Sequence, residues 1–95
     1  MRTYEVMTIH RPDLADDDVA THVGEIRTFL EGKGATIIAT DMWGKRRLAY
    51  EIEHLSEGYY TVVTFEAESE LIDEVDRMLS LADPVLRHKV VRPGA

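Results

Sequence analysis

The apolar residues of this chain change their spacing along the sequence, and this change of period limits the folds that the chain can adopt. Four stretches alternate apolar and polar residues, as half-buried strands do, and two carry apolar residues at the spacing of one helix face. The expected strands are residues 3–9, 36–52, 59–66 and 85–92, and the expected helices are residues 16–32 and 68–82. The order β-α-β-β-α-β predicts a ferredoxin-like α+β fold, a four-stranded antiparallel sheet with two helices on one face.

The first strand and the first helix have clear signals. Tyr4 and Val6 lie on one side of residues 3–9, and Met7 and Ile9 lie on the other. Both faces of this strand can therefore be buried, which favours a place in the middle of the sheet. The first helix begins with three aspartates, whose charge is stabilised at the positive end of the helix dipole.

Two glycines interrupt the expected elements. Gly24 lies inside the first helix, where glycine costs about 1 kcal/mol relative to alanine, and it suggests close packing of the helix on the sheet. Gly44 lies where the alternation of residues 36–52 slips, which indicates a β-bulge. Residues 54–58 are expected to form the turn of a hairpin, so that the strands on either side are antiparallel neighbours.

Length and composition exclude several classes of protein. With 95 residues, the chain is expected to be a single domain, residues 1–95, with one core. It contains no cysteine, which excludes disulfides and thiolate chemistry and fits a reducing compartment such as the cytoplasm. The start has no apolar signal segment, and no apolar run approaches the ~20 residues of a membrane span. We therefore expect a chain that is neither exported nor inserted into a membrane.

The net charge of -7 is distributed unevenly. The two expected helices hold ten acidic and two basic residues, whereas the rest of the chain holds nine basic and eight acidic residues. The strand side can therefore face an anion while the helices point away from it. In the alternative interpretation, the acidic helix surfaces only keep a small domain soluble.

The densest positive charge lies at residues 45–47, directly before the alternating stretch at residues 48–52. An arginine on a stiff strand loses little freedom when it binds a phosphate, and it can donate two parallel hydrogen bonds to that anion. The alternative is a solvated strand end whose charges prevent edge-to-edge aggregation. The residues concerned are Lys45, Arg46 and Arg47.

Other chemistries have little support. The four histidines have no metal-binding spacing and are interpreted as surface or loop residues, so no metal or cofactor is expected. The chain contains no Asn or Gln, no glycine-rich phosphate cradle and no Gly-x-Ser-x-Gly elbow, so an enzyme is not favoured. Residues 57–64 match the third-strand motif of RNA-recognition modules only at Gly58, Tyr59 and Val62. Threonines replace two of its aromatic residues, so stacking of several bases is not expected.

Five segments of the chain carry a family resemblance. They are Met-Arg-x-Tyr-Glu-Val at the start, Trp-Gly-Lys-Arg-Arg-Leu-Ala-Tyr-Glu-Ile at residues 43–52, Glu-Gly-Tyr-Tyr at 57–60, Asp-Arg-Met-Leu at 76–79, and Val-Leu-Arg-His-Lys-Val-Val-Arg at 85–92. Together they extend from Arg2 to about Arg92, nearly the whole chain. In these segments the chain resembles the bacterial small-subunit ribosomal protein six family.

The resemblance implies a non-enzymatic structural protein of the cytoplasmic ribosome. Such a protein binds the central domain of the small-subunit ribosomal RNA together with ribosomal protein eighteen, needs no cofactor, and is expected to be a monomer before assembly. By motif position, the RNA-facing edge would include Arg2, Lys45, Arg46 and Arg47, and the expected RNA-binding residues also include the cations of the last strand, Arg87, Lys89 and Arg92. The long acidic C-terminal extension of some relatives is absent, so no function of that tail is expected.

The protein partner is expected to contact a group of aromatic and apolar side chains, because exposed aromatic residues typically anchor protein interfaces. This group consists of Met42, Trp43, Tyr59 and Tyr60. The alternative function is a ferredoxin-like small-molecule sensing domain that dimerises through its open sheet face. Light scattering would distinguish such a homodimer from a monomer that waits for a different partner.

Overall fold

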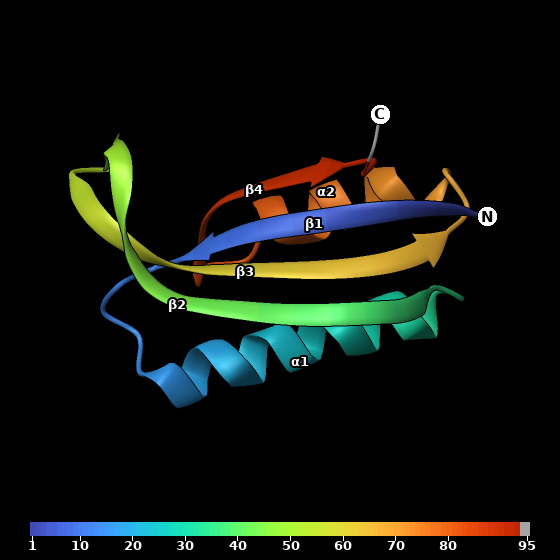
Figure 1. Cartoon of the computed structure of the whole chain (residues 1–95), viewed down its shortest axis with the longest axis horizontal. Helices are drawn as coiled ribbons and strands as arrows, with labels where there is room; N and C mark the ends of the chain where they lie inside the picture. The colour runs from blue at the N-terminus through green and yellow to red at the C-terminus, as the bar shows by residue number, and fades with distance from the viewer. Residues whose placement is uncertain (94–95) are drawn as a thin grey trace.

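The computed structural model describes residues 1–93 and has the predicted order of elements. The strands form one antiparallel sheet in the order β2-β3-β1-β4, and the two helices pack on one of its faces (Figure 1). This is the ferredoxin-like arrangement that the sequence predicts, with β1 in the middle. The elements are β1 (Arg2–His10), α1 (Asp16–Gly32), β2 (Thr36–Ile52), β3 (Leu55–Ala67), α2 (Leu71–Ser80) and β4 (Val85–Val91).

One face of the sheet, the helix-covered face, carries the main core. Val6 of β1 lies opposite Val63 of β3, and Tyr4 lies opposite Phe65, and all four side chains are buried. Because side chains alternate along a strand, every second residue of these strands meets the helices. The helices contribute Val19, Val23, Ile26 and Leu30 from α1 and Leu71, Val75 and Leu79 from α2.

The other face, the open face, has no helix over it in residues 1–93. Ile9 lies opposite Tyr60 there, and Met7 lies opposite Val62. Only a small buried cluster forms on this side, from Ile9 together with Leu48 and Ile52 of β2.

The β2–β3 hairpin is longer than the sequence suggests. Its turn consists of Glu53 and His54, so β3 begins at Leu55 rather than at the predicted residue 59. Both turn residues have positive φ, 51° and 67°, a conformation that two-residue hairpin turns require and that usually selects Asn-Gly. Nothing in residues 53–54 signals that turn, which explains the misplaced boundary. The helix α2 is shorter than the predicted 68–82. The close packing of Gly24 on the sheet is also wrong, because Gly24 is exposed and a Cβ added there would meet nothing within 4 Å.

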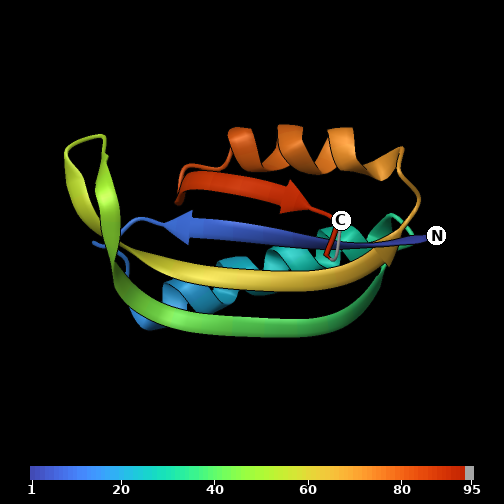
Figure 2. The same ribbon diagram turned by 45° about the horizontal axis from the view of Figure 1, so that its top comes forward.

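The tip of this hairpin curls away from the plane of the sheet, at the left of Figure 1 and Figure 2. The predicted bulge at Gly44 is confirmed by a register shift after Met42 and a φ of 84°. Another shift follows, because Arg47 pairs with Glu57 whereas Ile52 pairs with Leu55, so β2 carries three more residues than β3 over this part. An irregularity of this kind bends a strand and increases its twist.

Gly58 lets the curled hairpin approach the centre of the sheet. A Cβ atom at this position would lie 2.5 Å from Ile9 Cγ2 and 3.0 Å from the carbonyl oxygen of His10. Any larger residue would therefore push the hairpin away from β1.

No helix of the described residues is both long enough and apolar enough to cross a membrane.

Candidate functional site

The cations of β4 lie on the open face. Arg87 is in register with Ile9, and Lys89 is in register with Met7, both on the central strand. Since Ile9 and Met7 face away from the helices, the two cations do so as well. Arg87 and Lys89 therefore share the open face. The residue between them, His88, points the other way, and its Nε2 lies 3.1 Å from Asp76 Oδ1 of α2.

The basic run lies on β2 where the hairpin begins to curl. Lys45 places its ammonium 5.2 Å from the centre of the Tyr59 ring, within the range of a cation–π interaction. Arg46 donates a hydrogen bond from Nε to the carbonyl oxygen of Trp43, 3.2 Å away, and this bond leaves its terminal nitrogens free to bind an anion. Arg47 is exposed and pairs through its backbone with Glu57.

None of the seven predicted RNA-binding cations forms an ion pair within residues 1–93. The pairs that do form there lie elsewhere, such as Arg11 with Glu53 and Lys33 with Glu74, each at 3.5 Å. A cation without a carboxylate partner loses no existing ion pair when it binds a phosphate. The seven residues are Arg2, Lys45, Arg46, Arg47, Arg87, Lys89 and Arg92.

These seven residues form two groups rather than one edge. Arg2 pairs with Ala67, whereas Arg46 pairs with Gly58, nine residues earlier on β3. At the rise of a strand, nine residues correspond to roughly 30 Å. Arg92 directly follows β4 at the Arg2 end of the sheet. The expectation that Arg2 shares one edge with the basic run is therefore corrected, because the first residues of β1 and the curled hairpin lie at opposite ends of the molecule (Figure 1).

The four predicted partner-binding residues do not form one exposed cluster either. Trp43 stacks on Tyr60 over the open face, with ring centroids 6.2 Å apart and planes 11° apart, and Trp43 is 50% exposed. Met42 is 48% exposed but lies opposite Thr61, on the side of the helices. Tyr59 is 7% exposed, and its hydroxyl donates to the carbonyl oxygen of Leu14 at 3.1 Å. The expectation of an exposed Tyr59 is thus wrong, because alternation turns adjacent tyrosines to opposite faces.

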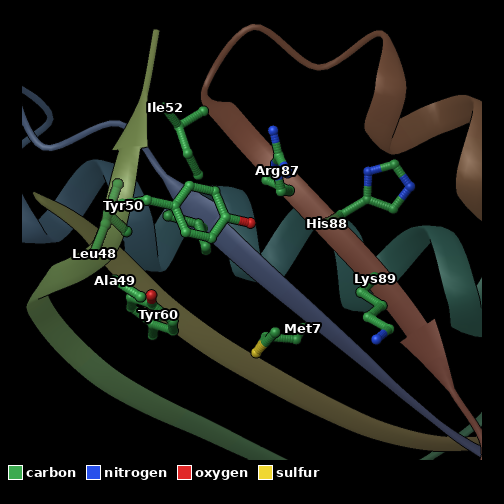
Figure 3. Close-up of a pocket in the computed structure, with 10 residues that line it drawn as sticks. Met7, Leu48, Ala49, Tyr50, Ile52, Tyr60, Arg87, His88 and Lys89 are labelled. Atoms are coloured by element: carbon green, nitrogen blue, oxygen red, sulfur yellow. The ribbon is translucent and has the colours of Figure 1, made fainter. Parts of the chain in front are cut away.

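A hollow of about 400 Å³ lies between the curled hairpin and the open face. We call it the open-face hollow, and Figure 3 shows the side chains around it. Met7, Ile9 and Tyr60 form its floor, Tyr50 comes from the hairpin, and Arg87 and Lys89 come from β4. Tyr50 is not among the predicted site residues, because its alternation with Leu48 and Ile52 predicts a buried side chain. The irregular part of β2 instead leaves Tyr50 64% exposed.

Two of the four histidines, His10 in β1 and His22 in α1, meet on the helix-covered side, so the prediction that the histidines are surface or loop residues is wrong for buried His10. His10 is fully buried, and its Nε2 lies 2.8 Å from Nδ1 of His22, while its own Nδ1 has no partner. Both rings are therefore neutral, with one ring nitrogen donating to the other, because burying a charged imidazole costs more than burying a neutral one. Burial, together with the repulsion from His22, lowers the pKa of His10 to about 4, and burial also lowers the pKa of His22.

The structure combines a ferredoxin-like sheet with exposed cations and aromatic side chains around the curled hairpin, and residues 1–93 contain no group of three metal-ligating residues. Comparison with known proteins gives the family. The family described as "Ribosomal protein S6" matches residues 3–92. The small ribosomal subunit protein bS6 of Clostridium botulinum strain 657 is 41% identical over 91 residues, covering 96% of this chain and 97% of its own length.

Two further relatives agree with this family. The protein bS6 of Desulforamulus reducens is 40% identical and covers 99% of each chain. The crystal structure of 30S ribosomal protein S6 from Thermotoga maritima superposes with a TM-score of 0.91 at 26% identity, covering 96% of this chain and 86% of that one. The chain therefore belongs to the ribosomal protein S6 family, whose members are small ribosomal subunit proteins and not a class of enzymes. Its membership places it in the ribosome, as the sequence predicted.

Proposed function

We propose that this protein binds the central domain of the small-subunit ribosomal RNA jointly with ribosomal protein eighteen, as a structural component without catalytic activity. The observation that carries this proposal is the group of cations without ion pairs around the curled hairpin, at positions 45–47, 87 and 89. The acidic helices α1 and α2 pack on the helix-covered face, whereas Arg87 and Lys89 lie on the open face. The protein therefore offers RNA one positive end on a negatively charged body.

The size of the positive end argues for a joint complex. Phosphate contacts supply most of the affinity of a protein for RNA, and five cations can neutralise only a few phosphates. The acidic helices repel the phosphates that lie beyond them. A second protein that adds its own cations would supply the missing affinity, and the same acidic helices would attract that basic partner.

The contact with the partner is best supported near Trp43. The stacked rings of Trp43 and Tyr60 are exposed on β2 and β3, and β2 is an edge strand, so it has backbone groups free to pair with another chain. Met42 offers a second apolar contact on the opposite side of the same strand. A partner that binds along the β2 edge would therefore contact Trp43 on one side of the strand and Met42 on the other.

Binding of an RNA fragment of the central domain, measured with and without ribosomal protein eighteen, tests this proposal. We expect submicromolar affinity only for the two proteins together, and we expect the emission of Trp43, the only tryptophan, to change when the partner is added. Trp43→Ala should weaken the joint complex, while Ile38→Ala, which alters another exposed β2 residue, should not. Submicromolar binding by the isolated protein at physiological salt would contradict the proposal, as would unchanged emission together with normal binding by Trp43→Ala.

A further inference from the structure

We propose that the open-face hollow holds one unpaired nucleotide of the bound RNA, whose base stacks on Tyr50 while a phosphate meets Arg87 and Lys89. This inference rests on the proposed function and assigns a specific role to a part of the molecule outside the basic run. A volume of about 400 Å³ suits a single nucleotide or another small group, and it is too small for a nucleic-acid duplex.

The shape is built into the backbone of the hairpin. The three additional residues on β2 between Arg47 and Ile52 lift the tip over the sheet, and Gly58 lets the base of the hairpin lie against Ile9. Leu48 and Ile52 are buried against Ile9, so the hairpin is held in this position by a small apolar cluster. The hollow is therefore present before any ligand binds.

The lining of the hollow fits a flat ring joined to an anion. Tyr50 is 64% exposed, and Figure 3 shows its ring in front of the sheet, between the hairpin and Arg87. Tyr60, Met7 and Ile9 supply an aromatic and apolar floor. No carboxylate lines the hollow, and neither Arg87 nor Lys89 forms an ion pair within residues 1–93. Aromatic rings that stack on an unstacked base and cations that meet its phosphate are the usual means of single-strand RNA recognition.

The occupant is part of a strand rather than a free nucleotide. One stacked base and two phosphate contacts at an open site give a free ligand only weak affinity, whereas an RNA already bound nearby presents its nucleotide at a high effective concentration. The basic run supplies that neighbouring contact. Arg46 lies opposite Gly58, whose Cβ position would lie against Ile9 in the floor of the hollow. A strand that touches the basic run can therefore reach the hollow within a few nucleotides.

Variants of Tyr50 test the proposal in the complex of this protein, ribosomal protein eighteen and the central-domain RNA. Tyr50→Ala should weaken binding about tenfold, the effect of losing one stacked base. Tyr50→Phe should bind as the unchanged protein does, because it keeps the ring. Arg87→Gln should weaken binding and flatten the slope of log affinity against log salt by about one. Leu81→Ala, a change at an exposed apolar residue next to α2, is the control and should have no effect.

Ultraviolet cross-linking of the same complex identifies what occupies the hollow. We expect a nucleotide adduct on a peptide that contains Tyr50. An adduct of Tyr50 with the partner protein, or normal RNA affinity of Tyr50→Ala when changes at residues 46 and 47 weaken binding, would overturn the nucleotide site and leave the proposed function standing. Tight binding of free adenosine monophosphate would overturn it in favour of small-molecule sensing. Failure of the unchanged complex to bind RNA would overturn both.

Discussion

The two faces of the single sheet differ in what covers them. On the helix-covered face, two helices bury an extended core that includes Val6 and Phe65. On the open face, the buried cluster within residues 1–93 consists of Ile9, Leu48 and Ile52, and the curled hairpin itself covers it. Because strand side chains alternate, the same strands supply the packed residues on one side and the free cations and aromatic rings on the other. Stability and binding can therefore be changed separately, one face at a time.

The largest contrast is expected between one aromatic residue from each face. Phe65→Ala removes a fully buried ring from the core and should lower the free energy of unfolding by about 3–5 kcal/mol. Trp43→Ala removes a half-exposed ring from the open face and should lower it by about 1 kcal/mol or less. Urea denaturation measures both. Equal losses for the two variants would show that the open face also carries the stability of the fold.

A second contrast concerns the buried histidine of the helix-covered face. The pKa of His10 is about 4 in the folded protein, whereas the ordinary value for histidine is 6.5. Between these pH values the unfolded chain therefore binds more protons than the folded protein does. The stability that comes from neutral His10 is therefore complete above about pH 6.5 and is lost as the pH falls towards 4. The full loss is roughly 3 kcal/mol.

The pH dependence is measured by urea denaturation between pH 7 and pH 5. His10→Gln should flatten the dependence, since glutamine does not titrate. His54→Asn, a change at the exposed turn that tolerates positive φ, should leave the dependence as it is. If His10→Gln and the unchanged protein lose stability in parallel, the histidine pair is not the group that responds to acid.

Smaller effects on stability than these are expected from two glycines of opposite character. Gly58→Ala forces a Cβ against Ile9 and the His10 backbone and should destabilise the fold by about 1–3 kcal/mol. It should also weaken RNA binding, because the hairpin moves away from the sheet. Gly24→Ala meets nothing within 4 Å inside α1 and should stabilise the fold by up to about 1 kcal/mol. Thermal unfolding compares them, and a stable Gly58→Ala would mean that the hairpin is not held against β1.

The sequence predicted the helix-covered face better than the open face, for a physical reason. The bounds of α1, the central place of β1 and the bulge at Gly44 follow from local periodicity and from the properties of glycine, and the structure confirms them. The open face depends on the path of the hairpin, which is set by a turn with unusual residues and by a mismatch in length between two strands. Local patterns contain neither feature, so they do not predict the exposure of Tyr50. The burial of Tyr59, by contrast, follows from alternation with the adjacent Tyr60.

The histidine pair shows the same limit. His10 and His22 are twelve positions apart on different elements, and only the packing of α1 against the end of β1 brings their rings together. Spacing rules detect ligands that share a helix or a short loop, so they could not find this pair. The two groups of cations could not be predicted for the same reason. The family motifs assign Arg2 and the basic run to one RNA-facing edge, but in the folded sheet the length of β1 separates them.

The most direct test of the central claim is the salt dependence of joint RNA binding by the double variant Arg46→Ala/Arg47→Ala. Both side chains are exposed, so the free energy of unfolding should change by no more than about 1 kcal/mol. The slope of log affinity against log salt should flatten by up to about two, one for each lost phosphate contact. Arg27→Ala/Arg77→Ala, which removes two exposed helix arginines, is the matched control and should leave the slope unchanged. An unchanged slope and affinity for the 46/47 variant, together with a lower melting temperature, would show that these arginines support the sheet and do not bind RNA.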